Sequence, residues 1–375
     1  MKIRLDYFLF FIIALLLLLG ISFLAVLSAP TSLKLNGSTD YFFIHQLLYG
    51  FLPGIILGLV AFFISLDYLK KISPVLVLAN LIVLCFTILP HLGMHIFGAS
   101  RWLNLGLVNL QPSEFLKITS ILYLSSLFKN KLGHEHAKKS NFRERNSYLL
   151  KEVFMPFLVY LFVISVIFVL QPNISTLVII GLIALVIYFA AGTPIWHSLS
   201  IICGAFLALF LLIKYESYRL ARLLVFLNPD ADPMGMGFQI KQSLIAIGSG
   251  GWAGRGFGMS SQIGFLPQTL SDATFAVFAE ETGFIGCLLL ILLFGLLLWT
   301  GLAIARRSDD KFSQLVATGI TFWILFQGFV NISAMTGIMP LTGVPLPFIS
   351  YGGSHIVTEL IAMGLLLNIA KRIKT

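Results

Sequence analysis

Charged residues are scarce in this sequence. Asp, Glu, Lys and Arg make up 11% of its 375 residues, whereas 58% are hydrophobic. A soluble core cannot absorb apolar runs as long as those this composition produces, so the soluble globular classes are excluded. The sequence therefore predicts an all-α polytopic membrane protein. Phenylalanine is abundant, with 34 residues, as expected where side chains face lipid or pack between helices.

Cysteine is scarce as well, and no CxxC pattern is present. The three cysteines each fall in a different hydrophobic run: Cys85, Cys203 and Cys287. A disulfide framework or a zinc site therefore has no support. His134 and His136 flank Glu135 in a charged loop, where such a pattern is usually only solvated. The chain also lacks repeats and a soluble region, so we expect one transmembrane domain over residues 1–375.

The hydrophobic runs predict ten transmembrane helices. Their approximate bounds are 7–28, 47–66, 73–95, 112–128, 153–171, 174–191, 196–214, 274–299, 313–333 and 353–370. The first run could be mistaken for a cleaved signal peptide with "LSAP" as its cleavage site. Its apolar stretch is too long for a typical signal peptide, and Pro30 follows the small residues awkwardly. We interpret it as a span.

Most of the 25 Lys and Arg residues gather on one side if the odd-numbered spans run outward. Positive charge on short cytoplasmic loops sets orientation, so both termini and the basic loop at about 129–152 should be cytoplasmic. The net charge of +9 then reflects topology and anionic lipid headgroups rather than nucleic acid. One large glycine-rich loop, at about 215–273 between spans seven and eight, is expected outside. Within it, "FQIKQSLIAIGSGG" has helical spacing and is expected to lie along the membrane surface.

The fourth span has a semi-polar entry, "GASRWLNLGLVNLQPSEFLK". Pro112 suits a first helical turn, and Glu114 and Lys117 then lie at i and i+3 on one face. They form either a self-neutralising structural pair or a functional site, because ions within a membrane are costly to keep. We expect Lys117 to lie within hydrogen-bonding reach of Glu114, Glu280 or Glu281.

The segment "GIMPLTGVPLPFISYGGSH" joins the last two spans and carries three prolines and four glycines. Such a segment cannot be a regular helix, and lipid would not satisfy its free backbone groups. We expect it to fold back into the bundle or to line a cavity.

Three carboxylates mark the eighth span. Asp272 follows Ser271 just before it, at an ordinary N-cap or first-turn position. Glu280 and Glu281 lie roughly 12–14 Å deeper at about 1.5 Å per residue. They point about 100° apart, so at least one should meet Lys117 or a cavity. The simplest alternative for them is a buried pair or a protonated acid, and we expect both to hold helices together.

These stretches, in this order, resemble the SEDS family (shape, elongation, division and sporulation), whose members include FtsW and RodA. The motifs that carry the resemblance are "RWLNLGLVNLQPSEFLK", "QPNIST", "FLNPDADPMGMGFQ", "LPQTLSDATFAVFAEETG" and "TGVPLPFISYGGS". The resemblance covers nearly the whole chain, and "NPDADPMGMGFQ" is closer to FtsW, the division member.

The resemblance implies a peptidoglycan glycosyltransferase in the bacterial cytoplasmic membrane. Such an enzyme polymerises lipid II into glycan strands at the outer face, in a division or elongation complex with a class B penicillin-binding protein. It also implies dependence on Mg²⁺ or Mn²⁺, no organic cofactor and no assigned metal ligands. Two alternatives stay open, a transporter of lipid-linked precursors and a non-catalytic scaffold. A transporter should show paired inverted repeats with broken helices, and the sequence shows only one broken segment.

The resemblance also places the site. The essential Asp of the family falls on Asp272, which we expect to accept a proton from an acceptor sugar in an outward-opening cavity bordered by Trp102 and residues 337–354. Cationic and motif side chains are candidates for substrate binding: Arg101, Trp102, Gln111, Ser113, Glu114, Lys117, Lys241, Arg255, Ser350, Tyr351 and Gly352. Arg219 and Arg222 are further cations available to a pyrophosphate. Asn173 and Gln268 replace carboxylates that the family usually has, which weakens any metal site built on them.

Overall fold

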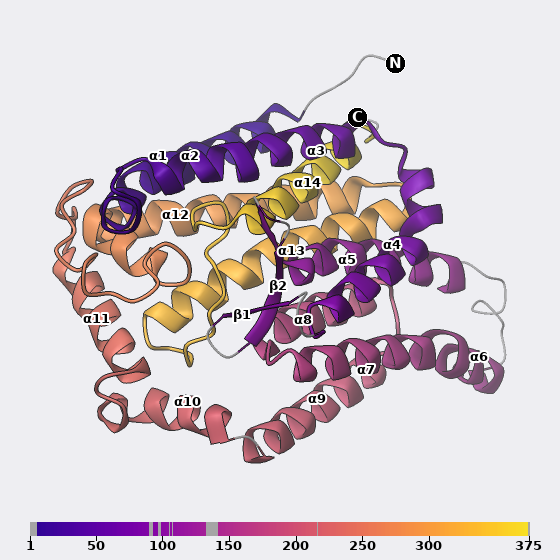
Figure 1. Ribbon diagram of the computed structural model, residues 1–375. Helices are drawn as coiled ribbons and strands as arrows, with labels where there is room; N and C mark the ends of the chain where they lie inside the picture. Colours follow the sequence, from indigo (N-terminus) through magenta and orange to yellow (C-terminus); the bar gives the residue numbers. More distant parts are fainter. Residues whose placement is uncertain are drawn as a thin grey trace.

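The computed structural model describes residues 6–89, 93–96, 99–104, 106, 108–132, 142–215 and 217–373. Long helices dominate the part of the chain that it describes, and most run side by side in one bundle (Figure 1). The α-helices are α1 (Tyr7–Asn36), α2 (Tyr41–Gln46), α3 (Leu52–Phe63), α4 (Leu66–Phe86), α5 (Pro112–Leu132), α6 (Phe142–Tyr148), α7 (Met155–Leu170), α8 (Ile174–Ala190), α9 (Ile195–Tyr215), α10 (Ser217–Leu227), α11 (Met236–Ser249), α12 (Thr274–Arg307), α13 (Lys311–Met335) and α14 (Gly353–Ala370). Short π-helical turns at Leu47–Phe51 and Leu149–Phe154 join α2 to α3 and α6 to α7.

Each of the ten predicted spans overlaps a helix. Within the described residues, seven helices are long and apolar enough to cross a membrane: Tyr7–Asn36, Tyr41–Phe63, Leu66–Phe86, Glu144–Leu170, Thr274–Arg307, Lys311–Met335 and Gly353–Ala370. The apolar stretches of α8 and α9 are shorter, and α5 carries Glu114 and Lys117 in its first turns. The polytopic all-α class is confirmed, and the number of ten membrane crossings stays a prediction.

The third span differs from its predicted bounds. Its helix α4 ends at Phe86, and Gly93 already belongs to a strand. Three strands, β1 (Gly93–Ile96), β2 (Ala99–Asn104) and β3 (Asn109–Leu110), form a small antiparallel sheet in the order β1-β2-β3. The semi-polar entry to α5 therefore satisfies part of its backbone through strand pairing, which the sequence did not indicate.

The two long loops are more ordered than predicted. Helix α5 continues to Leu132, and α6 begins at Phe142, so much of the basic 129–152 loop is helical. The His134 to His136 pattern lies outside the described residues. In the large glycine-rich loop, the helical spacing is confirmed by α11, and α10 precedes it. Helices α10 and α11 lie at the opposite end of the bundle from α6 and the C-terminus (Figure 1).

Helices α3 and α14 pack so closely that only small residues fit between them. A Cβ built on Gly364 would lie 2.1 Å from the carbonyl oxygen of Gly58. A Cβ on Gly58 would lie 2.8 Å from the Leu360 carbonyl oxygen. Within a membrane, where apolar side chains gain little by leaving lipid, such close backbone contact is a main source of helix association.

Helix α12 is interrupted at Gly283, whose φ of 66° and ψ of −166° are not helical. The loop before α12 fills this break. Backbone N–H groups of Arg255 and Gly256 donate to the carbonyls of Glu280 and Glu281, each at 3.0 Å. A Cβ on Gly254 would lie 2.1 Å from the Glu281 carbonyl oxygen. The glycine-rich run is therefore needed for close backbone approach, and it attaches the loop to the α12 break.

Candidate functional site

The segment 337–352, between α13 and α14, folds back into the bundle as predicted. Two direct hydrogen bonds and a two-bond bridge through Asn331 hold it against the start of α12. The Ser350 hydroxyl donates to the Ser271 carbonyl at 2.5 Å, and the Tyr351 N–H donates to the Leu270 carbonyl at 2.7 Å. The Asn331 amide on α13 donates to the carbonyls of Asp272 and Val344, at 2.8 and 2.7 Å. The segment is thus fixed next to Asp272.

Backbone strain within this segment marks how firmly it is held. Phe348 is buried and lies in the left-handed region with a φ of 65°, which is uncommon for a bulky residue. Its N–H donates to the Glu359 carboxylate at 2.9 Å. A Cβ on Gly20 of α1 would lie 2.0 Å from the Phe348 carbonyl oxygen. Such strain persists only where the surrounding contacts over-determine the conformation.

Asp272 lies in the turn before α12 and is 9% exposed. Its Oδ1 accepts a hydrogen bond of 2.6 Å from the Ser271 hydroxyl, and a Cβ on Gly343 would stand 3.7 Å from its Oδ2. Burial raises the pKa of the Asp272 carboxyl above its usual value, although the Ser271 hydrogen bond opposes this rise. The prediction that Asp272 is exposed is therefore wrong, because the 337–352 segment covers it. The capping interpretation also fails, since Ala273 is the N-cap and no side chain caps α12.

Two arginines face this carboxylate from opposite parts of the chain. Arg222 on α10 and Arg101 on β2 both lower the pKa of Asp272 through their positive charge, and their effects are smaller than those of burial and hydrogen bonding. The Arg222 guanidinium also donates to the Leu341 carbonyl at 3.1 Å. The Arg101 guanidinium donates to the Pro172 carbonyl at 2.6 Å. Two cations therefore lie near enough to act on Asp272 through their charge, and Arg222 is held by the 337–352 segment.

The "QPNIST" motif reaches the same place. The Ser175 hydroxyl at the start of α8 donates to the Thr342 carbonyl at 2.6 Å. Asn173, which stands where the family usually has Asp, accepts a hydrogen bond from the Thr176 hydroxyl at 2.9 Å. This motif thus joins the turn between α7 and α8 to the 337–352 segment and, through Pro172, to Arg101.

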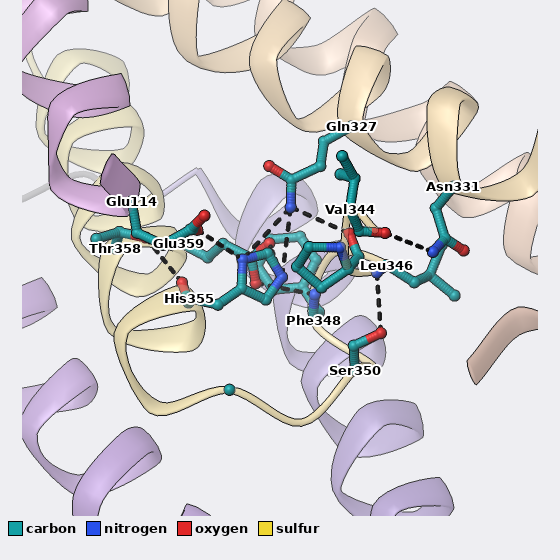
Figure 2. Close-up of polar contacts among 12 residues, drawn as sticks. Glu114, Gln327, Asn331, Val344, Leu346, Phe348, Ser350, His355, Thr358 and Glu359 are labelled. Carbon is teal, nitrogen blue, oxygen red and sulfur yellow. Dashed lines mark hydrogen bonds and ion pairs between the residues drawn. The ribbon is translucent and has the colours of Figure 1, made fainter. Parts of the chain in front are cut away.

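Deeper in the bundle, a second cluster of charged groups is buried. Figure 2 shows Glu114, His355 and Glu359 of this cluster. The Lys117 ammonium donates to Glu114 Oε2 at 2.7 Å and to Gln327 Oε1 at 2.8 Å. His355 lies between two carboxylates, with Nδ1 3.0 Å from Glu114 Oε2 and Nε2 3.0 Å from Glu359 Oε1. When the ring carries both protons, two anions balance two cations. The prediction that Lys117 meets Glu114 is confirmed.

This burial changes the interpretation of the fourth-span motif. Glu114 and Lys117 are 3% and 1% exposed, and their contacts with Gln327 and His355 join helices in the interior. Their part in substrate binding stays a prediction. The Ser113 hydroxyl is buried too and has no hydrogen-bond partner among the described residues. By contrast, the Gln111 backbone N–H has a partner, since it donates a hydrogen bond of 3.0 Å to the Ser354 hydroxyl. Substrate binding by these four residues was inferred from motif membership, which does not report the direction of a side chain.

The two glutamates of α12 separate in role. Glu280 is fully buried, and its carboxylate accepts hydrogen bonds from the hydroxyls of Ser260 and Ser261, at 2.5 and 2.9 Å, and from the Ser261 N–H at 3.0 Å. It therefore holds the glycine-rich loop rather than a second helix. Neither carboxylate oxygen of the buried Glu281 has a hydrogen-bond partner among the described residues. The prediction that both glutamates are buried is confirmed. Among the described residues, the two do not share a role in joining helices.

The remaining candidates lie apart from the buried cluster. Lys241 on α11 pairs with Asp230, and Arg255 donates to the Ser261 hydroxyl at 2.7 Å. Trp102 is half-buried on β2, beside Arg101. The Tyr351 hydroxyl bonds His45 Nδ1 at 2.9 Å, and the Gly352 N–H donates to Gln46 Oε1 at 3.2 Å. These last two contacts attach the 337–352 segment to α2.

Sequence reasoning missed several of the polar residues that organise this region: Gln327, Asn331, His355 and Glu359. Each lies within a long apolar helix, where a single amide, imidazole or carboxylate gives little pattern. The sequence could have indicated them, because a polar group is costly to keep within a membrane span. The same argument identified Lys117.

Metal binding was tested against the donor set. Among the residues that the structure describes, no three His, Cys, Asp or Glu side chains cluster in a way that could hold a metal ion. Asn173 and Gln268 supply amides where carboxylates were expected. The residues present do not fit a protein-held Mg²⁺ or Mn²⁺ site, and we derive no step through one.

Comparisons with known proteins give the family. A family model described as "Cell cycle protein", for FtsW, RodA and SpoVE, matches residues 7–375. A protein of Aliivibrio salmonicida named "Probable peptidoglycan glycosyltransferase FtsW" is 34% identical over 373 residues, covering 98% of this chain and 89% of that protein. Stage V sporulation protein E of Bacillus subtilis is 35% identical over 365 residues, covering 96% of each.

Solved structures share the fold. A chain from a peptidoglycan synthase complex that coordinates polymerization and crosslinking is similar, with a TM-score of 0.78 and 25% identity over 98% of both chains. RodA of Thermus thermophilus is similar with a TM-score of 0.70 and 24% identity, covering 100% of this chain and 99% of that one.

Proposed function

Because the chain belongs to the FtsW, RodA and SpoVE family of cell cycle proteins, we propose that it is a peptidoglycan glycosyltransferase that polymerises lipid II. Relatives that carry the FtsW name support a role in division. The observation that carries the proposal is that Asp272 lies covered by the 337–352 segment, where the positive charges of Arg101 and Arg222 act on its carboxylate. That arrangement provides a base and two cations at one place.

The reaction joins an acceptor sugar hydroxyl to the anomeric carbon of a second lipid-linked sugar. The hydroxyl oxygen forms the new bond, the bond between the anomeric carbon and the pyrophosphate oxygen breaks, and the hydroxyl proton must leave. Asp272 accepts that proton, since a carboxylate within reach can act as a general base. Arg101 and Arg222 stabilise the charge that develops on the leaving pyrophosphate. Trp102, adjacent to Arg101, offers a flat surface for stacking on sugar or lipid.

The setting of this reaction follows from the same proposal. The chain is a multi-pass membrane protein, and we place it in the bacterial cytoplasmic membrane with both termini inside, so that Asp272 and α11 lie at the outer face. The partner is a class B penicillin-binding protein, by analogy with the synthase complex that couples polymerization and crosslinking. Dependence on Mg²⁺ or Mn²⁺ stays a prediction, which chelation followed by addition of each ion would test.

The decisive experiment compares Asp272→Asn with the wild-type protein in vesicles that contain labelled lipid II and the partner. The amide keeps the shape of the side chain but removes its charge and its capacity to accept a proton. Glycan products should fall by roughly 100-fold or more, while partner binding and thermal stability persist. Asp309→Asn, an exposed Asp before α13, is the matched control. Wild-type polymerisation by a folded Asp272→Asn variant would contradict the role of Asp272 as the base, whereas a folded wild-type protein that forms no glycan with its partner would favour the scaffold or transporter classes.

A further inference from the structure

Gln268 closes the turn that carries Asp272 onto α12. Its carbonyl oxygen accepts hydrogen bonds from the N–H groups of Ser271 and Ala273, at 3.1 and 3.2 Å. Its backbone lies in the left-handed region, with a φ of 54°, which a residue with a side chain adopts at a cost. The turn therefore fixes where the Gln268 side chain points.

That side chain points at the Asp272 carboxylate. With the amide nitrogen turned toward it, Gln268 Nε2 lies 3.0 Å from Asp272 Oδ2 and 2.5 Å from Oδ1. The opposite orientation would set the amide oxygen against carboxylate oxygens, which are acceptors with no hydrogen between them. An ionised Asp272 therefore selects the orientation in which Gln268 donates.

The other groups around the Asp272 carboxylate do not by themselves offset the effect of its burial. Ser271 gives Asp272 one hydrogen bond, at 2.6 Å to Oδ1. Arg222 from α10 and Arg101 from β2 act on it through their positive charge. Ser271 and these two arginines favour the ionised carboxylate, whereas burial favours the protonated acid. A donor held against both carboxylate oxygens opposes that effect of burial directly.

We propose that Gln268 is the positioning residue of Asp272: its amide donates to the carboxylate, fixes its orientation and keeps it ionised for proton acceptance. The inference rests on the proposed function and deepens it. An amide also suits both stages of the reaction. Once Asp272 has taken the acceptor proton, rotation of the Gln268 amide presents its oxygen to the new carboxylic acid O–H. A carboxylate at position 268, which the family usually has, would donate only while it carries a proton, so the two acids would share one proton and the pH range of activity would shift.

The test is the pH profile of lipid II polymerisation by Gln268→Glu. This substitution keeps the shape of the side chain but puts two carboxylates together, so one of them retains a proton to higher pH. Activity relative to wild type should be reduced by roughly tenfold near pH 6 and should recover toward pH 8.5. Gln268→Ala, which removes the donor without adding charge, should lose activity over the same acidic range to a smaller extent.

Gln242→Glu on α11, at a partly exposed position, is the matched control and should keep the wild-type profile. Thermal unfolding and partner binding show whether each variant is folded. A Gln268→Glu profile that matches wild type, or a loss that is equal at every pH, would overturn the positioning role. Both results leave the proposed function intact, because that function fails only if the folded wild-type protein forms no glycan from lipid II.

Discussion

Two groups of acidic residues in this protein have different surroundings. In the interior, Glu114 and Glu359 contact His355 at 3.0 Å each, and Glu114 also accepts from Lys117. Near the end of the bundle that carries α11, Asp272 has hydroxyl and amide donors, and the positive charges of Arg101 and Arg222 act on it.

The difference separates packing from chemistry. An acid such as Glu114, which contacts Lys117 on its own helix and His355 on another, has its proton affinity and position committed to the fold. An acid held by neutral donors is oriented and yet still able to take a proton. Asp272 belongs to the second kind. The strained 337–352 segment covers it and separates it from the interior cluster of Glu114 and Glu359.

The largest effect on stability should come from Lys117→Met. This change removes the ammonium but keeps most of the apolar stem, so Glu114 and His355 stay buried with one cation missing. Breaking a buried pair from one side costs roughly 3–5 kcal/mol. Thermal unfolding in detergent should show the loss, and polymerisation should fall in step with the folded fraction.

The double variant Glu114→Gln with Lys117→Met is its control. Removing both charges relieves the uncompensated anion, so much of the lost stability should return. A single Lys117→Met variant as stable as wild type would mean that the interior cluster does not hold the bundle, and the contrast with Asp272 would fail.

Adjacent glutamates on α12 sharpen the comparison on a smaller scale. Glu280→Gln loses a charged acceptor that four hydrogen-bond donors and the Arg255 guanidinium use, so we expect a cost of roughly 1–3 kcal/mol. Glu281→Gln removes a buried carboxylate whose oxygens lack partners among the described residues, so it should be neutral or stabilising. Hydrogen exchange of residues 256–262 should rise in the first variant alone. Equal effects in both would contradict the separate roles of the pair.

How far the sequence predicts this structure depends on whether the information is local. Hydrophobic length located the helices, and the proline and glycine content of residues 337–355 correctly indicated an irregular segment within the bundle. The small sheet before α5 was missed because β1 and β2 depend on pairing rather than on an apolar run. Asp272 was placed at the correct end of α12, but its cover comes from residues some seventy positions away, which no local pattern reports. His355 was missed because its two partners, Glu114 and Glu359, identify it only once the helices pack.

The smallest effect concerns a pair near the start of α13, where Asp310 contacts both Lys129 on α5 and the Ser313 N–H. Partial burial raises the pKa of the Asp310 carboxyl, but the hydrogen bond from Lys129 and the contacts with Ser313 outweigh it, so its pKa is lowered on balance. A carboxyl with a lowered pKa in the folded state contributes stability above its unfolded pKa, near 4, and that contribution is lost as pH falls through the folded value.

Asp310→Asn retains much of the N-cap, since Asn and Asp cap helices similarly, and loses the charge. Because both partners of the ion pair are partly exposed, solvent screens it, and the cost at pH 7 should be about 0.5 kcal/mol or less. The difference in unfolding temperature between Asp310→Asn and wild type should shrink as the pH is lowered below about 4, and high salt should reduce it at pH 7. A difference that grows on acidification would show that Asp310 is not held ionised by Lys129. This small, salt-sensitive effect is the response expected of an exposed pair, whereas the Lys117 variant should respond little to salt because its partners are enclosed.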